Sequence, residues 1–217
     1  MVLNLKGFIN PLILTTVAFL LAVQVNVHNG KGHLDKAKEE EVKPTGTRYQ
    51  LAVINPAPDF TLVDLEDKET NLKDLKGKVK IINFIYTSCP DACPIATGML
   101  SKLQEILKKD GLLGERVGII SISLDPERDT VERLQKYADG FKADCKSWMF
   151  LRGTDQQTKK VLSDYDIWTK KLDDGTIDHV MRVYLVDGED RIREIYNLAF
   201  LQSELVVRDI EMIFIEK

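Results

Sequence analysis

Apolar runs alternate with amphipathic segments along most of the chain after residue 55. Short continuous apolar runs are typical of buried strands, and apolar residues three and four positions apart are typical of helices. Strands that alternate with helices and end in a hairpin predict an α/β fold with one antiparallel sheet edge. The expected strands are residues 57–62, 79–86, 117–124, 148–151, 180–186 and 191–196, and the expected helices are residues 95–109, 130–141, 156–165 and 203–215, the last capped by Ser203.

The longest apolar stretch is residues 12–23, close to the amino end. It has the length of the apolar region of a signal peptide, whereas a membrane-spanning helix needs roughly 20 residues. The small residues that mark a cleavage site do not follow it, because Ala22, Val23 and Gln24 match that pattern poorly. We therefore expect residues 1–27 to be an uncleaved membrane anchor, with a signal peptide as the alternative.

Polar residues with several glycines follow this stretch. Such a composition is typical of a linker. The domain organisation expected is an anchor over residues 1–27, a polar linker over residues 28–50 and one folded domain over residues 51–217. The folded domain would then lie on the outer, periplasmic or equivalent, side of the cytoplasmic membrane.

Composition adds limits to this picture. A chain of 217 residues with 44% hydrophobic content can bury one good core. A net charge of −4 gives no basic footprint for nucleic acid, so we expect no nucleic-acid partner. Three cysteines are too few to build a disulfide scaffold, so the thiols are expected to be functional.

Two of these thiols, Cys89 and Cys93, directly follow the apolar run of residues 79–86 and are flanked by Pro90 and Pro94. Proline is tolerated in the first turn of a helix, so Cys89 should lie in a loop and Cys93 in the first turn. Residues four apart share one face of a helix, so both sulfurs would point to the same spot. The spacing by itself leaves metal binding and disulfide exchange open. The third cysteine, Cys145, is expected to be a half-buried bystander.

A soft metal needs a further ligand besides two thiolates, and histidine is the natural nitrogen donor. The predicted folded domain contains a single histidine, His179, expected at the start of the strand of residues 180–186. A histidine with a structural role is the alternative. Met181 is expected to pack in the core rather than bind metal.

Three segments resemble the Sco/SenC family of membrane-tethered, thioredoxin-like copper proteins that assist the assembly of cytochrome c oxidase. They are residues 87–94 (TSCPDACP), residues 123–130 (SLDPERDT), and Asp178 and His179 together with residues 184–188 (YLVDG). The segments occur in the family's order, and the resemblance covers roughly residue 56 to the end of the chain.

The resemblance implies that Cys89, Cys93 and His179 hold one copper ion, Cu(I) or Cu(II), and that the two thiols also form a redox disulfide. It implies that Asp129 lies near the site, where the alternative is a helix N-cap before Thr130. The implied partner is the dinuclear copper centre of cytochrome c oxidase subunit II or another copper-accepting protein. A metallochaperone rather than an enzyme is expected.

The main alternative is a thiol–disulfide oxidoreductase that reduces the cysteines of a copper-site partner. Such enzymes usually carry two cysteines separated by two residues and a downstream cis-proline, but here three residues separate the cysteines and no proline follows Pro126. A peroxiredoxin-like motif is missing, because Ile82 and Tyr86 stand where proline and threonine would be needed. A purely structural disulfide would close a very small loop and stabilise little. Copper carriage is the preferred prediction, and thiol reduction is compatible with it.

Overall fold

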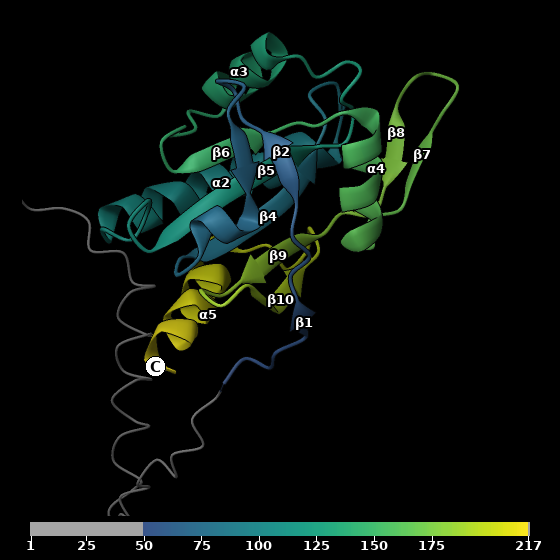
Figure 1. The fold of residues 1–217 in the computed structure, drawn as a ribbon. Coiled ribbons are helices and arrows are strands. Elements are labelled where there is room, and N and C mark those ends of the chain that lie inside the picture. Colours follow the sequence, from purple (N-terminus) through teal and green to yellow (C-terminus); the bar gives the residue numbers. More distant parts are fainter. Residues whose placement is uncertain (1–49, 217) are drawn as a thin grey trace, which may run out of the picture. The chain divides into compact units, whose positions relative to one another are not determined.

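The computed structural model describes residues 50–216, and a six-stranded mixed sheet forms its centre (Figure 1). The strand order is β1-β10-β9-β4-β5-β6. The strands β4, β5 and β6 are parallel, whereas β9, β10 and β1 are antiparallel to their neighbours, as expected for a sheet with one antiparallel edge. The strands are β1 (Asn55–Pro56), β4 (Val79–Ile85), β5 (Val117–Ser123), β6 (Trp148–Leu151), β9 (Val183–Val186) and β10 (Arg191–Tyr196).

The strand β4 is central because its side chains are compatible with burial on both faces. All seven residues of β4 are buried, including Lys80, whose ammonium pairs with the Asp190 carboxylate. A continuous run of buried β-branched and aromatic residues is typical of an interior parallel strand. The carboxyl end of β4 therefore lies in the middle of one sheet edge, and the thiol segment follows directly.

Helices α2 (Ala92–Lys109), α3 (Val131–Gly140) and α5 (Ser203–Ile215) lie together. Tyr137 of α3 hydrogen-bonds to Thr97 of α2, and Ser203 of α5 donates a hydrogen bond to the Met99 carbonyl of α2. Helix α4 (Asp155–Asp164) is followed by Tyr165, whose hydroxyl donates a hydrogen bond to the Pro58 carbonyl. The end of α4 therefore lies near the segment that leads from β1 to residue 61. A short 3-10 helix, η1, spans Leu72–Leu75.

Three local expectations were wrong. Residues 57–62 do not form one strand, because β2 (Thr61–Val63) pairs with β3 (Glu69–Asn71) in a separate hairpin. The strand expected at residues 180–186 begins only at Val183. Ser203 is the first residue of α5 rather than its cap, since its hydroxyl bonds to α2 and Gln202 takes the cap position.

The expectations for the amino-terminal anchor, and for the linker up to residue 49, lie outside the described residues. Within residues 50–216, no helix is both long and apolar enough to cross a membrane.

A second small hairpin was not predicted from the sequence. Its strands are β7 (Thr169–Lys171) and β8 (Ile177–His179), and they form a separate two-stranded sheet. Figure 1 shows this hairpin beside α4, outside the main sheet. The signal in the sequence is the turn at Asp173, Asp174 and Gly175, where Gly175 adopts a φ of +81° that suits glycine.

Candidate metal centre

The thiols lie where the sequence predicted them. The Cys89 N–H donates to the Tyr86 carbonyl at 3.1 Å, so the chain turns sharply after β4. Cys93 is in the first turn of α2, and its N–H donates to the Cys89 sulfur at 3.4 Å. Cys93 is fully buried and Cys89 is half-buried, so Cys89 is the more accessible of the two sulfurs.

The imidazole of His179 reaches the same spot from the far end of the chain. Its Nε2 lies 3.6 Å from the Cys93 sulfur, and the two sulfurs and one imidazole nitrogen all lie within 4.8 Å of one another. His179 ends strand β8 of the separate hairpin, so the position expected for it, at the start of a strand of the main sheet, was wrong. The predicted meeting of these three side chains is nevertheless what the structure contains.

A backbone contact orients the ring of His179. Its Nδ1 lies 3.2 Å from the Val180 carbonyl oxygen, which can only accept a hydrogen bond. This contact favours the tautomer with its proton on Nδ1, which leaves the lone pair of Nε2 available to a metal. Two thiols and one free imidazole nitrogen form a donor set that suits a soft metal such as copper.

Tyr86 connects the thiols to the hairpin and was overlooked as a site residue. Its hydroxyl hydrogen-bonds to the Cys89 sulfur and accepts the Ile177 N–H of β8 at 3.2 Å. Its ring lies edge-on to His179, with 6.0 Å between the ring centroids. One side chain thus contacts a thiol, the backbone of the hairpin and the imidazole. Its place as the last apolar residue before the thiol segment was the available signal.

The two thiols differ in acidity. A hydrogen bond from the Cys93 thiol lowers the pKa of Cys89 to about 5, helped by the N–H groups of Asp91 and Cys93 and by the Tyr86 hydroxyl. The same hydrogen bond and burial raise the pKa of Cys93. At neutral pH the reduced site therefore holds a thiolate at Cys89 and a protonated thiol at Cys93.

This difference predicts selective alkylation. Iodoacetamide reacts with thiolates, so in the reduced, metal-free chain Cys89 should be modified first, with a rate that rises around pH 5. Cys93, which is buried, and Cys145, whose pKa is raised by burial and by Asp139, should react only in alkaline solution. Mass spectrometry of the modified peptides measures this order. An alkylation rate at Cys89 that rises only near pH 8.5, about the ordinary pKa of a thiol, would contradict this prediction.

Asp129 is fully buried behind the thiol segment. It accepts hydrogen bonds from the Thr87 hydroxyl at 2.6 Å, the Thr87 N–H at 3.1 Å and the Ser123 hydroxyl at 2.6 Å. Burial raises its pKa, although these hydrogen bonds oppose the rise. The alternative role as a helix N-cap does not apply, because Thr130 caps α3 by accepting from the Arg133 N–H. Asp129 instead joins the start of the thiol loop to the end of β5, a contact that sequence reasoning did not identify.

The remaining candidates lie outside the cluster. Cys145 is exposed, so the expectation of a half-buried thiol was wrong. Met181 packs against the core, as expected. The Asp125 carbonyl accepts the N–H groups of Arg128 and Asp129, which forms a turn after β5.

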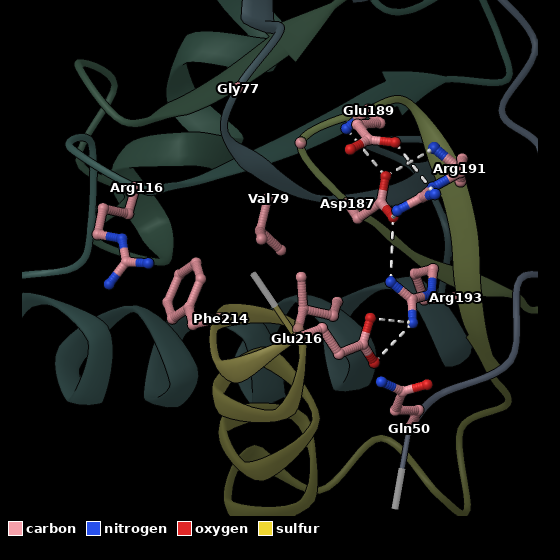
Figure 2. Close-up of a pocket in the computed structure, with 12 residues that line it drawn as sticks. Gln50, Gly77, Val79, Arg116, Asp187, Glu189, Arg191, Arg193, Phe214 and Glu216 are labelled. Atoms are coloured by element: carbon pink, nitrogen blue, oxygen red, sulfur yellow. Dashed lines mark hydrogen bonds and ion pairs between the residues drawn. The ribbon is translucent and has the colours of Figure 1, made fainter. Parts of the chain in front are cut away.

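A charged pocket lies at the opposite end of the sheet (Figure 2). It has a volume of about 410 Å³, and its charged groups are largely paired with one another. Arg193 bonds to Asp187 at 3.1 Å and to Glu216 at 2.6 Å, and Arg191 bonds to Asp187 at 2.8 Å. Because these charges are already satisfied, we interpret the pocket as part of the structural framework.

Comparison with known proteins agrees with this geometry. A model of the SCO1/SenC family matches residues 50–214. A SCO1/SenC family lipoprotein from Bacillus anthracis superposes with a TM-score of 0.68 at 28% identity, covering 74% of this chain and 95% of the other. ScoI of Bradyrhizobium japonicum, solved with copper bound, superposes with a TM-score of 0.63 at 32% identity. This match covers 72% of this chain and 98% of the other. BsSco, described as a cytochrome c oxidase assembly protein with a disulfide switch, superposes with a TM-score of 0.67 at 28% identity. This match covers 78% of this chain and 100% of the other.

These likenesses confirm the predicted α/β, thioredoxin-like fold with a mixed central sheet and flanking helices. They extend over the thiol loop, α2 and the hairpin that carries His179, because the family match runs from residue 50 to residue 214. The chain belongs to the SCO1/SenC family.

Proposed function

We propose that the chain is a membrane-tethered copper carrier that serves the assembly of cytochrome c oxidase. One copper ion is held by the sulfurs of Cys89 and Cys93 and by Nε2 of His179. The observation that carries this proposal is the convergence of these three ligand atoms within 4.8 Å. The copper bound to the ScoI relative supports copper as the metal.

The donor set fits a carrier of one ion. Thiolates favour Cu(I), and the imidazole also permits Cu(II). Binding at neutral pH displaces a proton from Cys93, because that thiol is protonated in the reduced site. Asp129 and Tyr86 act as positioning residues, since one holds Thr87 of the thiol loop and the other holds Cys89 and the hairpin.

Delivery proceeds by ligand exchange. Cys89 is the more accessible sulfur, so a thiol of the acceptor approaches the ion on that side and replaces the ligands one at a time. The acceptor proposed is the dinuclear copper centre of cytochrome c oxidase subunit II. The description of BsSco as an oxidase assembly protein supports this choice.

Thiol reduction is the second candidate function, and the acidity of Cys89 favours it specifically. A half-exposed thiolate attacks one sulfur of a partner disulfide and forms a mixed disulfide with it. The Cys93 thiol then loses its proton and displaces the partner, which leaves a Cys89–Cys93 disulfide and two reduced cysteines on the partner. The disulfide switch described for BsSco supports this chemistry.

The location proposed follows from the hydropathy pattern. Residues 1–27 anchor the chain, residues 28–50 form a polar tether, and residues 51–217 form the copper-binding domain on the outer side of the cytoplasmic membrane. The lipoprotein relative from Bacillus anthracis supports a membrane-attached arrangement.

A transfer experiment separates carriage from reduction. The copper-loaded chain is mixed with the metal-free, reduced copper domain of the oxidase subunit, and the absorbance of the acceptor's copper centre is recorded. Transfer should occur with the native chain and with Cys145→Ser, but not with Cys93→Ser. In a parallel arm, the copper-free reduced chain is offered the oxidised acceptor.

The outcomes distinguish the two roles. Transfer of copper in the first arm supports carriage, and appearance of acceptor thiols in the second supports reduction. A competing chelator is present in both cases to capture copper that is not handed over directly. If free copper then fills the acceptor as fast as the copper-loaded chain does, the carrier role is contradicted.

A further inference from the structure

Exposed apolar side chains gather on the hairpin that carries His179. Trp168 just before β7, Leu172 just after it and Val180 just after β8 are all exposed, and Trp168 keeps 54% of its surface accessible. We propose that these three side chains, the hairpin stripe, are the docking surface for the copper-accepting protein. This inference rests on the proposed function and names the surface through which its partner binds.

The strand register places the stripe and the metal ligand on opposite faces of the hairpin. Thr169 pairs with His179, and Lys171 pairs with Ile177. Directly paired residues of an antiparallel hairpin share a face, and successive residues alternate. His179 and its three face partners therefore point one way, and the neighbouring positions 168, 172 and 180 point the other way. On the His179 face Thr169, Ile177 and His179 are half-buried and Lys171 is exposed, whereas all three residues of the stripe are exposed.

The stripe is continuous with the copper site along the backbone. The Val180 N–H donates to the Trp168 carbonyl at 3.2 Å, one residue beyond the pair of Thr169 and His179. Figure 1 shows the hairpin at the side of the molecule, next to α4. A protein seated on this stripe therefore contacts the same hairpin that carries the metal ligand His179.

Other exposed apolar residues lie at the same end of the sheet. Ile95 is in the first turn of α2, next to the thiols, and Phe200 follows β10, whose last residue Tyr196 pairs with Val183. Because Val183 also pairs with Asn83 near the carboxyl end of β4, the β10–α5 loop lies at the thiol end. Large apolar side chains are therefore concentrated where an acceptor has to approach.

The chemistry of the hairpin favours a protein over a lipid surface. The hairpin carries three carboxylates (Asp173, Asp174 and Asp178) against two lysines (Lys170 and Lys171), so its net charge is negative, and Lys170 lies directly opposite Asp178. Anionic lipid headgroups attract lysine and arginine, whereas carboxylates are repelled. A partner with apolar side chains around its own copper ligands fits the stripe. The small size of the stripe suits a short-lived contact rather than a permanent dimer, because stable interfaces bury about 800 Å² on each partner.

Trp168 provides a direct probe of docking. The chain has two tryptophans, and Trp148 is fully buried, so quenching of fluorescence by iodide reports on Trp168. The full chain is reconstituted in vesicles with a low protein content, and the copper-free acceptor domain is added. We expect the acceptor to protect Trp168 from iodide.

Copper transfer is then compared between variants. The double variant Trp168→Thr with Val180→Thr should transfer copper to the acceptor roughly tenfold or more slowly, as expected when central aromatic contacts of an interface are removed. Extraction of copper by a small chelator, which needs no docking, should change less than about twofold. The matched control, Val53→Thr with Ile54→Thr, removes exposed apolar side chains next to β1, and it should transfer at the native rate.

Several results would overturn the docking proposal, and one would contradict only the proposed function. Native transfer by the stripe variant, or full quenching of Trp168 with acceptor bound, shows that docking occurs elsewhere. Protection of Trp168 by vesicles before acceptor is added indicates a lipid surface. Protection that depends on protein density in the vesicles indicates a second copy of the chain. If the chain binds no copper but the acceptor still protects Trp168, the proposed function fails and the docking surface stands.

Discussion

Replacing His179 with alanine is expected to lower the copper affinity on the order of 100-fold or more, because even the hydrogen-bond partners of metal ligands are commonly worth 10- to 100-fold. His179 supplies the nitrogen ligand of the proposed site, and its ring faces Cys93 at 3.6 Å. Competition with a chelator of known affinity measures the change. The fold should be retained, since His179 is half-buried at the end of a peripheral hairpin.

The chain offers matched controls for this experiment. His33→Ala removes a histidine of the predicted linker, and Cys145→Ser removes an exposed thiol outside the cluster. Both variants should bind one copper with native affinity. Native affinity in His179→Ala would refute the three-ligand site and leave only the two thiols.

Replacing Asp187 with alanine is expected to destabilise the fold by roughly 3–5 kcal/mol, the usual effect of breaking a buried ion pair. The Asp187 carboxylate is buried and bonds to Arg191 and Arg193, and it accepts the N–H groups of Glu189 and Arg191 (Figure 2). Its loss leaves buried Arg193 with a single carboxylate partner, Glu216. Urea unfolding measures the change in free energy.

A second salt bridge serves as the control for Asp187. Asp155→Ala breaks an exposed pair with Lys159, which should change stability by only about 0–1 kcal/mol. Copper stoichiometry should be unchanged in Asp187→Ala, because the network lies at the opposite end of the sheet from the thiols. Destabilisation no larger than in Asp155→Ala would show that Arg193 is satisfied without Asp187.

The effect of Asp187 should depend on pH. Burial acts to raise the pKa of Asp187, but hydrogen bonds from Arg191, Glu189 and Arg193 lower it overall. A carboxylate whose pKa is lowered by folding contributes its full stabilisation at pH values above its pKa in the unfolded chain, about 3.9. This contribution is lost as the pH falls through the lower pKa of the folded chain. The difference between the native chain and Asp187→Ala should therefore shrink in acid.

The sequence was sufficient to predict the thiol half of the site. An apolar run, two prolines and a four-residue spacing place Cys89 in a loop and Cys93 in a first helical turn, because these are local preferences of the backbone. The main sheet was predictable for the same reason, since its strands are continuous apolar runs such as β4.

The position of His179 was not predictable in this way. Strands β7 and β8 have three residues each, and Ile177 is the single apolar residue among these six, so they lack the apolar run that marks a strand. The contacts that Asp129 and Tyr86 make were not predictable for a related reason. Their hydrogen bonds to Thr87 and Ile177 span 42 and 91 residues, and local patterns carry no information about such contacts.

The two-part construction of the site has a consequence for how such proteins can diversify. The sulfur ligands come from the core of the domain, where any change disturbs packing, whereas the nitrogen ligand comes from a hairpin that forms its own small sheet. Natural or laboratory selection can therefore exchange the residue at position 179 at little risk to folding. A third thiol there would favour Cu(I), and a side chain without a donor would leave a dithiol suited to electron exchange. Metal choice and foldability are thus separable traits in this scaffold.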